Sequence, residues 1–325
     1  MIEVKAYTSD LKEQWNSFVA LADNSNFLFN RSFMEYHSDR FNDASILLFD
    51  EGILIGIFPA NKKDSTVYSH QGLTYGGLIL NERRNVKKLI EYYHSVFAYY
   101  SSNGVSEIVY KPVPSYLSRT VNDLEHFVLN ILKAEVTKVD TAFVIDYRNE
   151  IKFQERRRRS VKKGEKANTE IKTDNDFAAY WNSILVPNLR DKFGTAPVHS
   201  LEEIQLLHSR FPEQIKQANA YINGEIVAGV TLFEFNECIH CQYISSNDFG
   251  RDSGAIDLLF NNLIHLYQKD KKYFGLGTAN NNGNDINIGL CEWKEGWGAK
   301  IHAQFHYKFK TENINGLERF FKSNA

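Results

Sequence analysis

The sequence has little cysteine, no long apolar run and almost no net charge. Three cysteines among 325 residues are too few, and odd in number, for a framework of disulfide bonds. No run approaches the roughly 18 apolar residues that a membrane-spanning helix needs. The formal net charge is −2, so affinity for nucleic acid or anionic membranes has to come from a local patch. The first ten residues contain acid and no apolar stretch, so we expect no signal peptide and a cytoplasmic protein.

What is present is an ordinary globular composition, with 43% hydrophobic and 24% charged residues. The length suggests about two domains. The most informative stretch is 220–278. It predicts a strand, an Asn223-Gly224 hairpin turn, a strand over 225–235 and a strand over 238–246. A polar loop at 247–254, a helix with apolar residues at helical spacing and a buried strand at 273–277 follow.

The same order of elements is predicted near the N-terminus. Strands at 44–50 and 53–60 flank Glu51-Gly52, and a strand at 66–70 leads into a loop with three glycines over 71–80. A helix at 82–102 and a strand at 106–113 complete the series. Coincidence is the alternative, because meanders are common. We favour a duplicated architecture and predict an α/β protein of two halves, residues 1–148 and 149–325, each with a mainly antiparallel sheet and flanking helices.

Capping residues predict where several helices begin and end. Ser9 or Asp10 is the expected N-cap of a helix over 9–21, and Asn81 that of the helix at 82–102. Ser200 and Glu203 have the spacing of a capping box, which predicts a helix that ends before Pro212.

Several segments together resemble bacterial proteins of the GNAT superfamily, and more narrowly the FemABX-like acyltransferases. The resemblance covers nearly the whole chain. It rests on sequences at 29–41 (FNRSFMEYHSDRF), 69–80 (SHQGLTYGGLIL), 242–260 (QYISSND…GAIDLLF), 273–283 (YFGLGTANNNG) and 289–299 (GLCEWKEGWGA). That group is similar in having two GNAT-like halves. It includes enzymes that use aminoacyl-tRNA to build peptidoglycan cross-bridges and enzymes that use acyl-CoA in surface-polysaccharide assembly.

The resemblance implies an acyl-donor site in the second half. The donor would run beside Ile244, Ser245 and Ser246, whose strand would pair with its amides. The GNAT donor motif Q/R-x-x-G-x-G/A is matched at Arg251 and Gly254, with Ala255 next and Ile256 at the last small position. Backbone N–H groups of this loop and the following helix, with Arg251, are expected to hold phosphate. An ordinary strand–helix loop is the alternative.

Transfer of an acyl group to an amine needs a base and an acid. Glu234, His240, Asp257, Glu292 and Glu295 are the candidates nearest the proposed cleft, and of these we select His240, Glu292 and Glu295, with Tyr243 as donor to the leaving group. Each has a plainer reading. His240 fits a hydrogen-bonded core histidine, Tyr243 fits packing in a strand, and the two glutamates fit a solvated loop.

Acceptor binding is predicted from two other segments. His70, Thr74 and Tyr75, beside the glycines of the first loop, would line the equivalent cleft of the first half. The basic run Arg156–Arg159, continued by Lys162, Lys163 and Lys166, is either a solvated helix or an anion site that includes Arg157. The anion would be a tRNA acceptor stem, the phosphates of the donor, or a nucleotide- or lipid-linked sugar.

No metal is expected. Cys238 and Cys241 form a C-x-x-C, but residues three apart in a strand face opposite sides, and Cys291 is the remaining cysteine. The leading hypothesis is an N-acyltransferase that moves an acyl group, acetyl from acetyl-CoA in the first instance, to an amine of an amino sugar or cell-envelope precursor. Direct attack is expected, because no Cys/His nucleophile arrangement is present. The alternatives are an aminoacyl-tRNA-dependent transferase and a non-catalytic binding domain.

Overall fold

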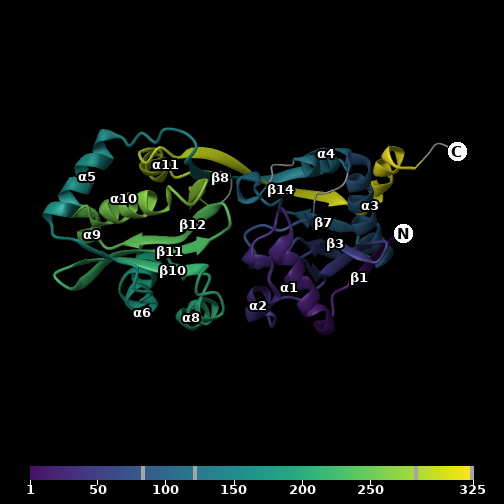
Figure 1. Cartoon of the computed structure of the whole chain (residues 1–325), viewed down its shortest axis with the longest axis horizontal. Helices are drawn as coiled ribbons and strands as arrows, with labels where there is room; N and C mark the ends of the chain where they lie inside the picture. Colours follow the sequence, from purple (N-terminus) through teal and green to yellow (C-terminus); the bar gives the residue numbers. More distant parts are fainter. Residues whose placement is uncertain (82–84, 120–122, 282–284, 323–325) are drawn as a thin grey trace. The chain divides into compact units, whose positions relative to one another are not determined.

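The structure is a computed structural model, and it describes residues 1–81, 85–119, 123–281 and 285–322. The chain forms two compact units. Unit 1 holds Met1–Asp140 and Ala303–Ala325, and unit 2 holds Thr141–His302. Figure 1 shows that strands and flanking helices make up both units. No helix in the described part of the chain combines the length and the apolarity needed to cross a bilayer.

Unit 1 is built on short strands in two groups. The first group has the order β1-β2-β3-β6, and the second has β4-β5-β7 followed by parts of β14 and β8. The strands are β1 Ile2–Ala6, β2 Ile46–Asp50, β3 Ile53–Phe58, β4 Asn61–Lys63, β5 Thr66–Tyr68, β6 Ile79–Leu80, β7 Glu107–Tyr110, β8 Glu135–Asp146 and β14 Lys300–Lys310. The helices are α1 Lys12–Leu21, α2 Arg31–Met34, α3 Val86–Ser102 and α4 Leu124–Ile131, with a 3-10 segment, η6, at Thr311–Phe320.

Two expected caps in unit 1 are wrong. The helix α3 begins at Val86, and Asn85 rather than Asn81 caps it by accepting a hydrogen bond from the Lys88 N–H; residues 82–84 of the predicted helix lie outside the described residues. Residues 9–11 form a 3-10 turn, and α1 starts after it at Lys12 without a side-chain cap, so neither Ser9 nor Asp10 has the expected role. The β2–β3 hairpin is confirmed, with both Glu51 and Gly52 at positive φ.

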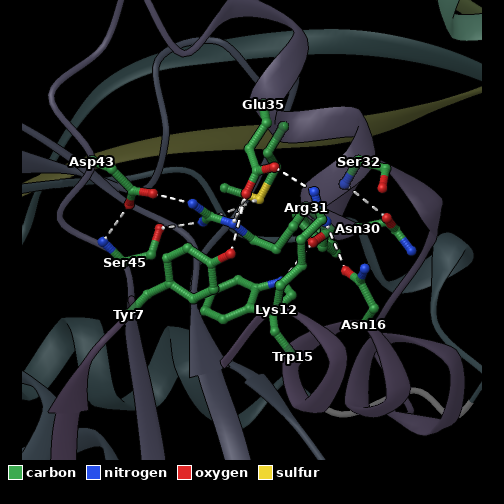
Figure 2. Close-up of polar contacts among 12 residues, drawn as sticks. Tyr7, Lys12, Trp15, Asn16, Asn30, Arg31, Ser32, Glu35, Asp43 and Ser45 are labelled. Carbon is green, nitrogen blue, oxygen red and sulfur yellow. Dashed lines mark hydrogen bonds and ion pairs between the residues drawn. The ribbon is translucent and has the colours of Figure 1, made fainter. Parts of the chain in front are cut away.

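A buried arginine holds the N-terminal part of unit 1 together (Figure 2). The Arg31 guanidinium lies 3.6 Å from the centre of the Tyr7 ring and donates to Glu35 at 3.3 Å and to Ser45 at 3.2 Å, and it also pairs with Asp43. Its charge is therefore fully compensated, and Glu35 and Asp43 have lowered pKa values because cations neighbour them, although burial opposes this. Arg31 thus joins α2 to Tyr7, directly after β1, and to the chain before β2.

Unit 2 is one mixed sheet with helices on both faces (Figure 1). Its strand order is β8-β13-β12-β11-β10-β9, in which β12 and β13 are parallel and the other pairs antiparallel. The strands are β9 Glu170–Lys172, β10 Ile215–Ile222, β11 Glu225–Glu234, β12 Cys238–Ser246 and β13 Tyr273–Thr278. Asn223 and Gly224 both have positive φ, so the predicted hairpin is confirmed, although β10 begins five residues earlier than expected.

The helices of unit 2 cover the two faces of the sheet. The apolar core on one face joins α10 to the sheet through Leu259, Phe260 and Leu263. The helices are α5 Glu155–Lys166, α6 Phe177–Tyr180, α7 Val186–Phe193, α8 Leu201–Arg210, α9 Asp248–Asp252, α10 Ala255–Tyr267 and α11 Ile288–Glu295. A π-helical turn, Trp181–Leu185, connects α6 to α7. The capping box at Ser200 is confirmed. The expected loop 247–254 is mostly the short helix α9.

The two units repeat one motif. In unit 1, β5 leads through α3 to β7, and in unit 2, β12 leads through α10 to β13; each pair of strands is parallel. The two units differ from the expected halves, 1–148 and 149–325, in where they begin and end. The chain passes between units within β8 after Asp140 and returns within β14 after His302, so residues 303–322 pack with unit 1. The predicted boundary between the halves, near residue 148, lies just after β8 ends, whereas the two units divide inside that strand.

Candidate functional site

The parallel strands β12 and β13 separate after a short pairing. They pair at Cys238, Ile239 and His240, although β12 continues to Ser246. The register of β12 against β11 also shifts, because Thr231 faces Tyr243 while Leu232 faces Cys241. Gln242 is therefore an extra residue in β12, a β-bulge that bends the strand. Within the described part of the chain, the last part of β12 therefore has a free backbone edge on the side of β13, where an extended ligand can pair.

The corresponding place in unit 1 is occupied by the chain itself. The Lys111 N–H donates to the Ser69 hydroxyl at 2.8 Å, and Gly76 forms a bridge with Pro112 beyond β7. A Cβ atom on Gly76 would lie 2.2 Å from the Ser69 carbonyl oxygen, so only glycine fits there. As far as the described residues of unit 1 go, its motif therefore has no free edge equivalent to that of β12.

A cavity of about 550 Å³ opens at the free edge of β12. Three predicted donor residues, Ile244, Ser245 and Ser246, line it from the strand, and Arg251 lines it from α9. The other lining residues come from α5, α7, α9, α10 and α11: Arg156, Arg157, Ser160, Asn188, Lys192, Asp252, Ile256, Asp257, Leu290 and Trp293. Asn188 donates to the Ser245 hydroxyl at 2.9 Å, so α7 is fixed against the end of β12.

The 550 Å³ cavity is cationic. Its lining has four cationic and two acidic side chains. The pKa of Lys192 is lowered by burial and by the neighbouring Arg251 charge. Arg251 donates to the Ser246 carbonyl at 2.7 Å and pairs with Asp248, so its guanidinium is held against the strand end. Asp248 and Asp257 offset the charges of Arg251 and Arg157. Arg156 and Lys192 have no ion pair among the described residues, so the lining keeps positive charge and suits a ligand with phosphate groups.

A buried ion pair forms one wall of the cavity. Arg157 of α5 donates to both carboxylate oxygens of Asp257 at 2.7 and 2.9 Å, and the Trp293 indole N–H donates to the same carboxylate at 3.0 Å. Both charged side chains are under a tenth exposed. Asp257 was a candidate base, but here it fixes α5 and α11 to the start of α10.

In the predicted phosphate loop, Gly254 packs against α5 instead of facing the cavity. Gly254 has φ +81°, and a Cβ atom there would lie 2.2 Å from the Ser160 carbonyl oxygen and 3.0 Å from the Gly164 nitrogen. Gly164 in turn lies against the Gly254 carbonyl. The first turn of α10 therefore packs on α5, and Gly254 and the buried Ala255 lie outside the cavity lining while Arg251 belongs to it.

A second cavity, of about 440 Å³, adjoins the first. Gln154, Arg156, Arg157, Gly289, Glu292 and Trp293 line it. Arg156, Arg157 and Trp293 line both cavities. The predicted residues Glu292 and Glu295 are both exposed, and of the two only Glu292 lines a cavity.

Lys294 was missed by the sequence reasoning. Its side chain is buried, and its ammonium donates to the carbonyls of Gly277 at 3.1 Å and Thr278 at 2.5 Å, at the end of β13. Burial lowers its pKa to about 8, against the opposing influence of Cys241 and Cys291. A single lysine between two acids in the run EWKEG gave no sign of burial. Lys294 itself lines neither cavity, whereas its neighbour Trp293 lines both.

His240 and Tyr243 lie in β12 but outside the lining of either cavity. Burial, and then the Lys294 charge, lower the pKa of His240 to about 4, so it is neutral at pH 7. The Tyr243 hydroxyl lies 2.7 Å from His199 Nδ1, and burial raises its pKa to about 12. Glu234 pairs with Lys216 and Lys271.

The acceptor residues predicted in the first half all belong to unit 1, whereas Arg157 belongs to unit 2. His70 is buried at φ +64°, and burial, then the adjacent His37, lower its pKa to about 3. Tyr75 is buried and accepts a 3.4 Å hydrogen bond from Asn26, and Thr74 is exposed. In the described ranges, no group of three or more His, Cys, Asp or Glu side chains is arranged to hold a metal ion.

The fold defines a class: an α/β protein of two GNAT-like halves, FemABX-like in its overall architecture. FemX is similar over 95% of this chain and 97% of its own, with a TM-score of 0.69 and 10% identity. A tandem GNAT protein from the clavulanic acid biosynthesis pathway gives 0.52 and 10%, covering 96% and 99%. The C-terminal domain of a putative lysylphosphatidylglycerol synthetase from Agrobacterium fabrum gives 0.53 and 10%, covering 96% and 95%. No family model and no curated protein matches the sequence.

Proposed function

We propose that unit 2 is an acyltransferase that moves an acyl group from a phosphate-bearing carrier to an amine, with acetyl-CoA or another acyl-CoA as the first candidate carrier. The observation that carries this proposal is the cationic 550 Å³ cavity at the free edge of β12. An extended carrier can pair with that edge while its phosphates meet Lys192 and Arg251.

The chemistry follows from the place where β12 and β13 separate. A backbone N–H at the Gln242 bulge would stabilise the oxyanion formed as the amine attacks the acyl carbon. Lys294 would supply positive charge there and a proton for the leaving group, because its pKa of about 8 lies near neutral pH. His240, neutral at pH 7, stays a candidate for proton transfer, and Tyr243 one for the leaving group.

The test is acetyl-CoA binding by isothermal titration calorimetry with the wild-type protein and Arg251→Gln and Lys192→Gln. Each variant should weaken binding by about tenfold or more, because a charge-assisted hydrogen bond contributes roughly 1.5–3 kcal/mol. Arg190→Gln is the matched control, since Arg190 is an exposed arginine of α7 that belongs to neither lining. Release of free thiol with a panel of amines then measures transfer.

A second carrier, aminoacyl-tRNA, is favoured by one observation. α5 exposes six cationic side chains next to the cavity: Arg156, Arg158, Arg159, Lys162, Lys163 and Lys166. RNA binding that falls steeply with salt, and loses slope when Arg158 and Arg159 are changed to Gln, would support this carrier. Absence of binding to both acyl-CoA and charged tRNA would refute the proposed activity and leave a non-catalytic domain as the better account.

A further inference from the structure

The 440 Å³ cavity differs from its neighbour in charge. Arg157 is neutralised by Asp257, which leaves Arg156 as the uncompensated cation and Glu292 as the uncompensated anion of the lining. Within the described part of the chain, the side chains of Arg156 and Glu292 have no hydrogen bond or ion pair, with each other or with other residues. Opposite charges that face one cavity without meeting match a ligand that carries both signs.

The position of Glu292 defines where each charge of the ligand would lie. Gly289 and Glu292 are three residues apart on α11 and line the same cavity, so they lie on one face of the helix, roughly 5–6 Å apart. Gly289 is in the first turn, where backbone N–H groups favour an anion and the missing side chain permits close approach. An anionic group would lie between Gly289 and Arg156, and a cationic group one helical turn further on, at Glu292.

We infer that this cavity binds the amine acceptor, and that the acceptor is a zwitterion: an amino acid or short peptide with a free α-amino group and a carboxylate. Arg156 and the start of α11 bind the carboxylate, Glu292 binds the ammonium, and the Trp293 ring contacts the side chain. The volume accommodates an amino acid with a long side chain or a dipeptide. This inference rests on the proposed acyl transfer and adds the chemical class of the acceptor.

The arrangement also accounts for the protons. The ammonium transfers one proton to the Glu292 carboxylate, which passes it to solvent, and the free amine becomes the nucleophile. Its nitrogen forms a bond to the acyl carbon while the C–S bond of a thioester, or the C–O bond of an aminoacyl ester, breaks. The leaving sulfur or oxygen keeps the electron pair and takes a proton from Lys294, and the second proton of the amine restores the Lys294 ammonium.

Binding is tested with the full chain. A thermal-shift screen of the twenty L-amino acids and glycylglycine selects a ligand, and calorimetry then compares it with its C-terminal amide and its N-acetyl derivative. D-Glucosamine serves as an amine without a carboxylate. Each derivative, and glucosamine, should bind at least about tenfold more weakly than the selected ligand, because each lacks one charge-assisted contact. Equal binding of the amide or of glucosamine would overturn the inference.

Variants distinguish the effect of charges that line the cavity from the effect of changing any charge on the protein. Glu292→Gln and Arg156→Gln should each weaken the selected ligand by about tenfold, whereas Glu165→Gln and Arg190→Gln should not. Glu165 and Arg190 are exposed and line neither cavity. Circular dichroism and acetyl-CoA binding establish that Glu292→Gln is folded; equal loss in the two control variants would count against the site.

The two proposals fail separately. Donor binding, with acetyl-CoA or charged tRNA, but no response to any amino acid or to glycylglycine refutes the zwitterion site and leaves the acyltransferase proposal intact. Amino acid binding that depends on Glu292, with no donor bound, refutes the acyltransferase proposal and keeps the site as a binding site for amino acids.

Discussion

The buried pair of Arg157 and Asp257 makes the sharpest prediction. Asp257 accepts three hydrogen bonds, two from Arg157 at 2.7 and 2.9 Å and one from Trp293 at 3.0 Å. Asp257→Asn keeps the shape of the side chain but leaves a buried guanidinium without its counter-charge. Breaking a buried pair in this way costs about 3–5 kcal/mol of unfolding free energy.

The control is a comparable pair at the surface of the same unit. Arg148 donates to both oxygens of Asp146, but its side chain is 59% exposed. Asp146→Asn should therefore cost only about 0–1 kcal/mol. The double variant Arg157→Met/Asp257→Leu removes both buried charges together, and it should cost less than Asp257→Asn alone, because no charge is left unpaired.

Urea unfolding followed by tryptophan fluorescence measures these differences. Trp15 belongs to unit 1, and Trp181, Trp293 and Trp297 belong to unit 2, so a Trp15→Phe background makes the signal report on unit 2. Coincidence with the circular dichroism transition checks that one transition is followed. A cost below about 1 kcal/mol for Asp257→Asn, or a double variant as unstable as the sum of its parts, would refute the reasoning.

Three further predictions concern packing and pH. Gly254→Ala should destabilise by about 1–3 kcal/mol more than Gly224→Ala, because both glycines have φ near +80° but only the Cβ at 254 meets backbone atoms; similar urea midpoints would contradict this. The pKa of Lys294 is lowered from 10.5 to about 8, so between these two pH values the unfolded chain binds more protons than the folded one. The free energy of unfolding of the wild type, relative to that of Lys294→Met, should rise over this range by up to about 3 kcal/mol. A difference that does not change with pH would count against a buried ammonium. The pKa of His70 is lowered from 6.5 to about 3, so this residue should contribute stability that is lost as pH falls from about 6.5 towards 3. The free energy of unfolding of His70→Asn should therefore fall less with pH than that of the wild type, as measured by denaturation at a series of pH values.

Local sequence signals predicted much of the fold. The Asn223-Gly224 turn, the capping box at Ser200, and the strand, helix and strand that became β12, α10 and β13 were placed correctly, because each depends on neighbours within a few residues. The short helix α9 was expected to be a loop. The misplaced helix caps also come from reasoning on local residue types. Asn81 and Asn85 are both good caps by type, and propensity alone does not choose between them.

The candidate site was predicted in part. Ile244, Ser245, Ser246 and Arg251 line the cavity because their order along β12 and α9 is a local property. Gly254 was expected to accommodate phosphate, yet it accommodates α5, which lies about ninety residues earlier in the chain. The buried ammonium of Lys294, on α11, depends likewise on carbonyls at the end of the strand β13.

The sequence by itself determined the α/β class and the repeated order of strands and helix, because periodicity and turn chemistry are encoded over short distances. The tertiary structure alone decided which charges are neutralised and which stay free. Arg157 meets Asp257 across one hundred residues, whereas Arg156, its neighbour in the chain, has no partner among the described residues and faces both cavities. Adjacent arginines look alike in a sequence, and the difference arises because successive residues of a helix point about 100° apart and so meet different surroundings.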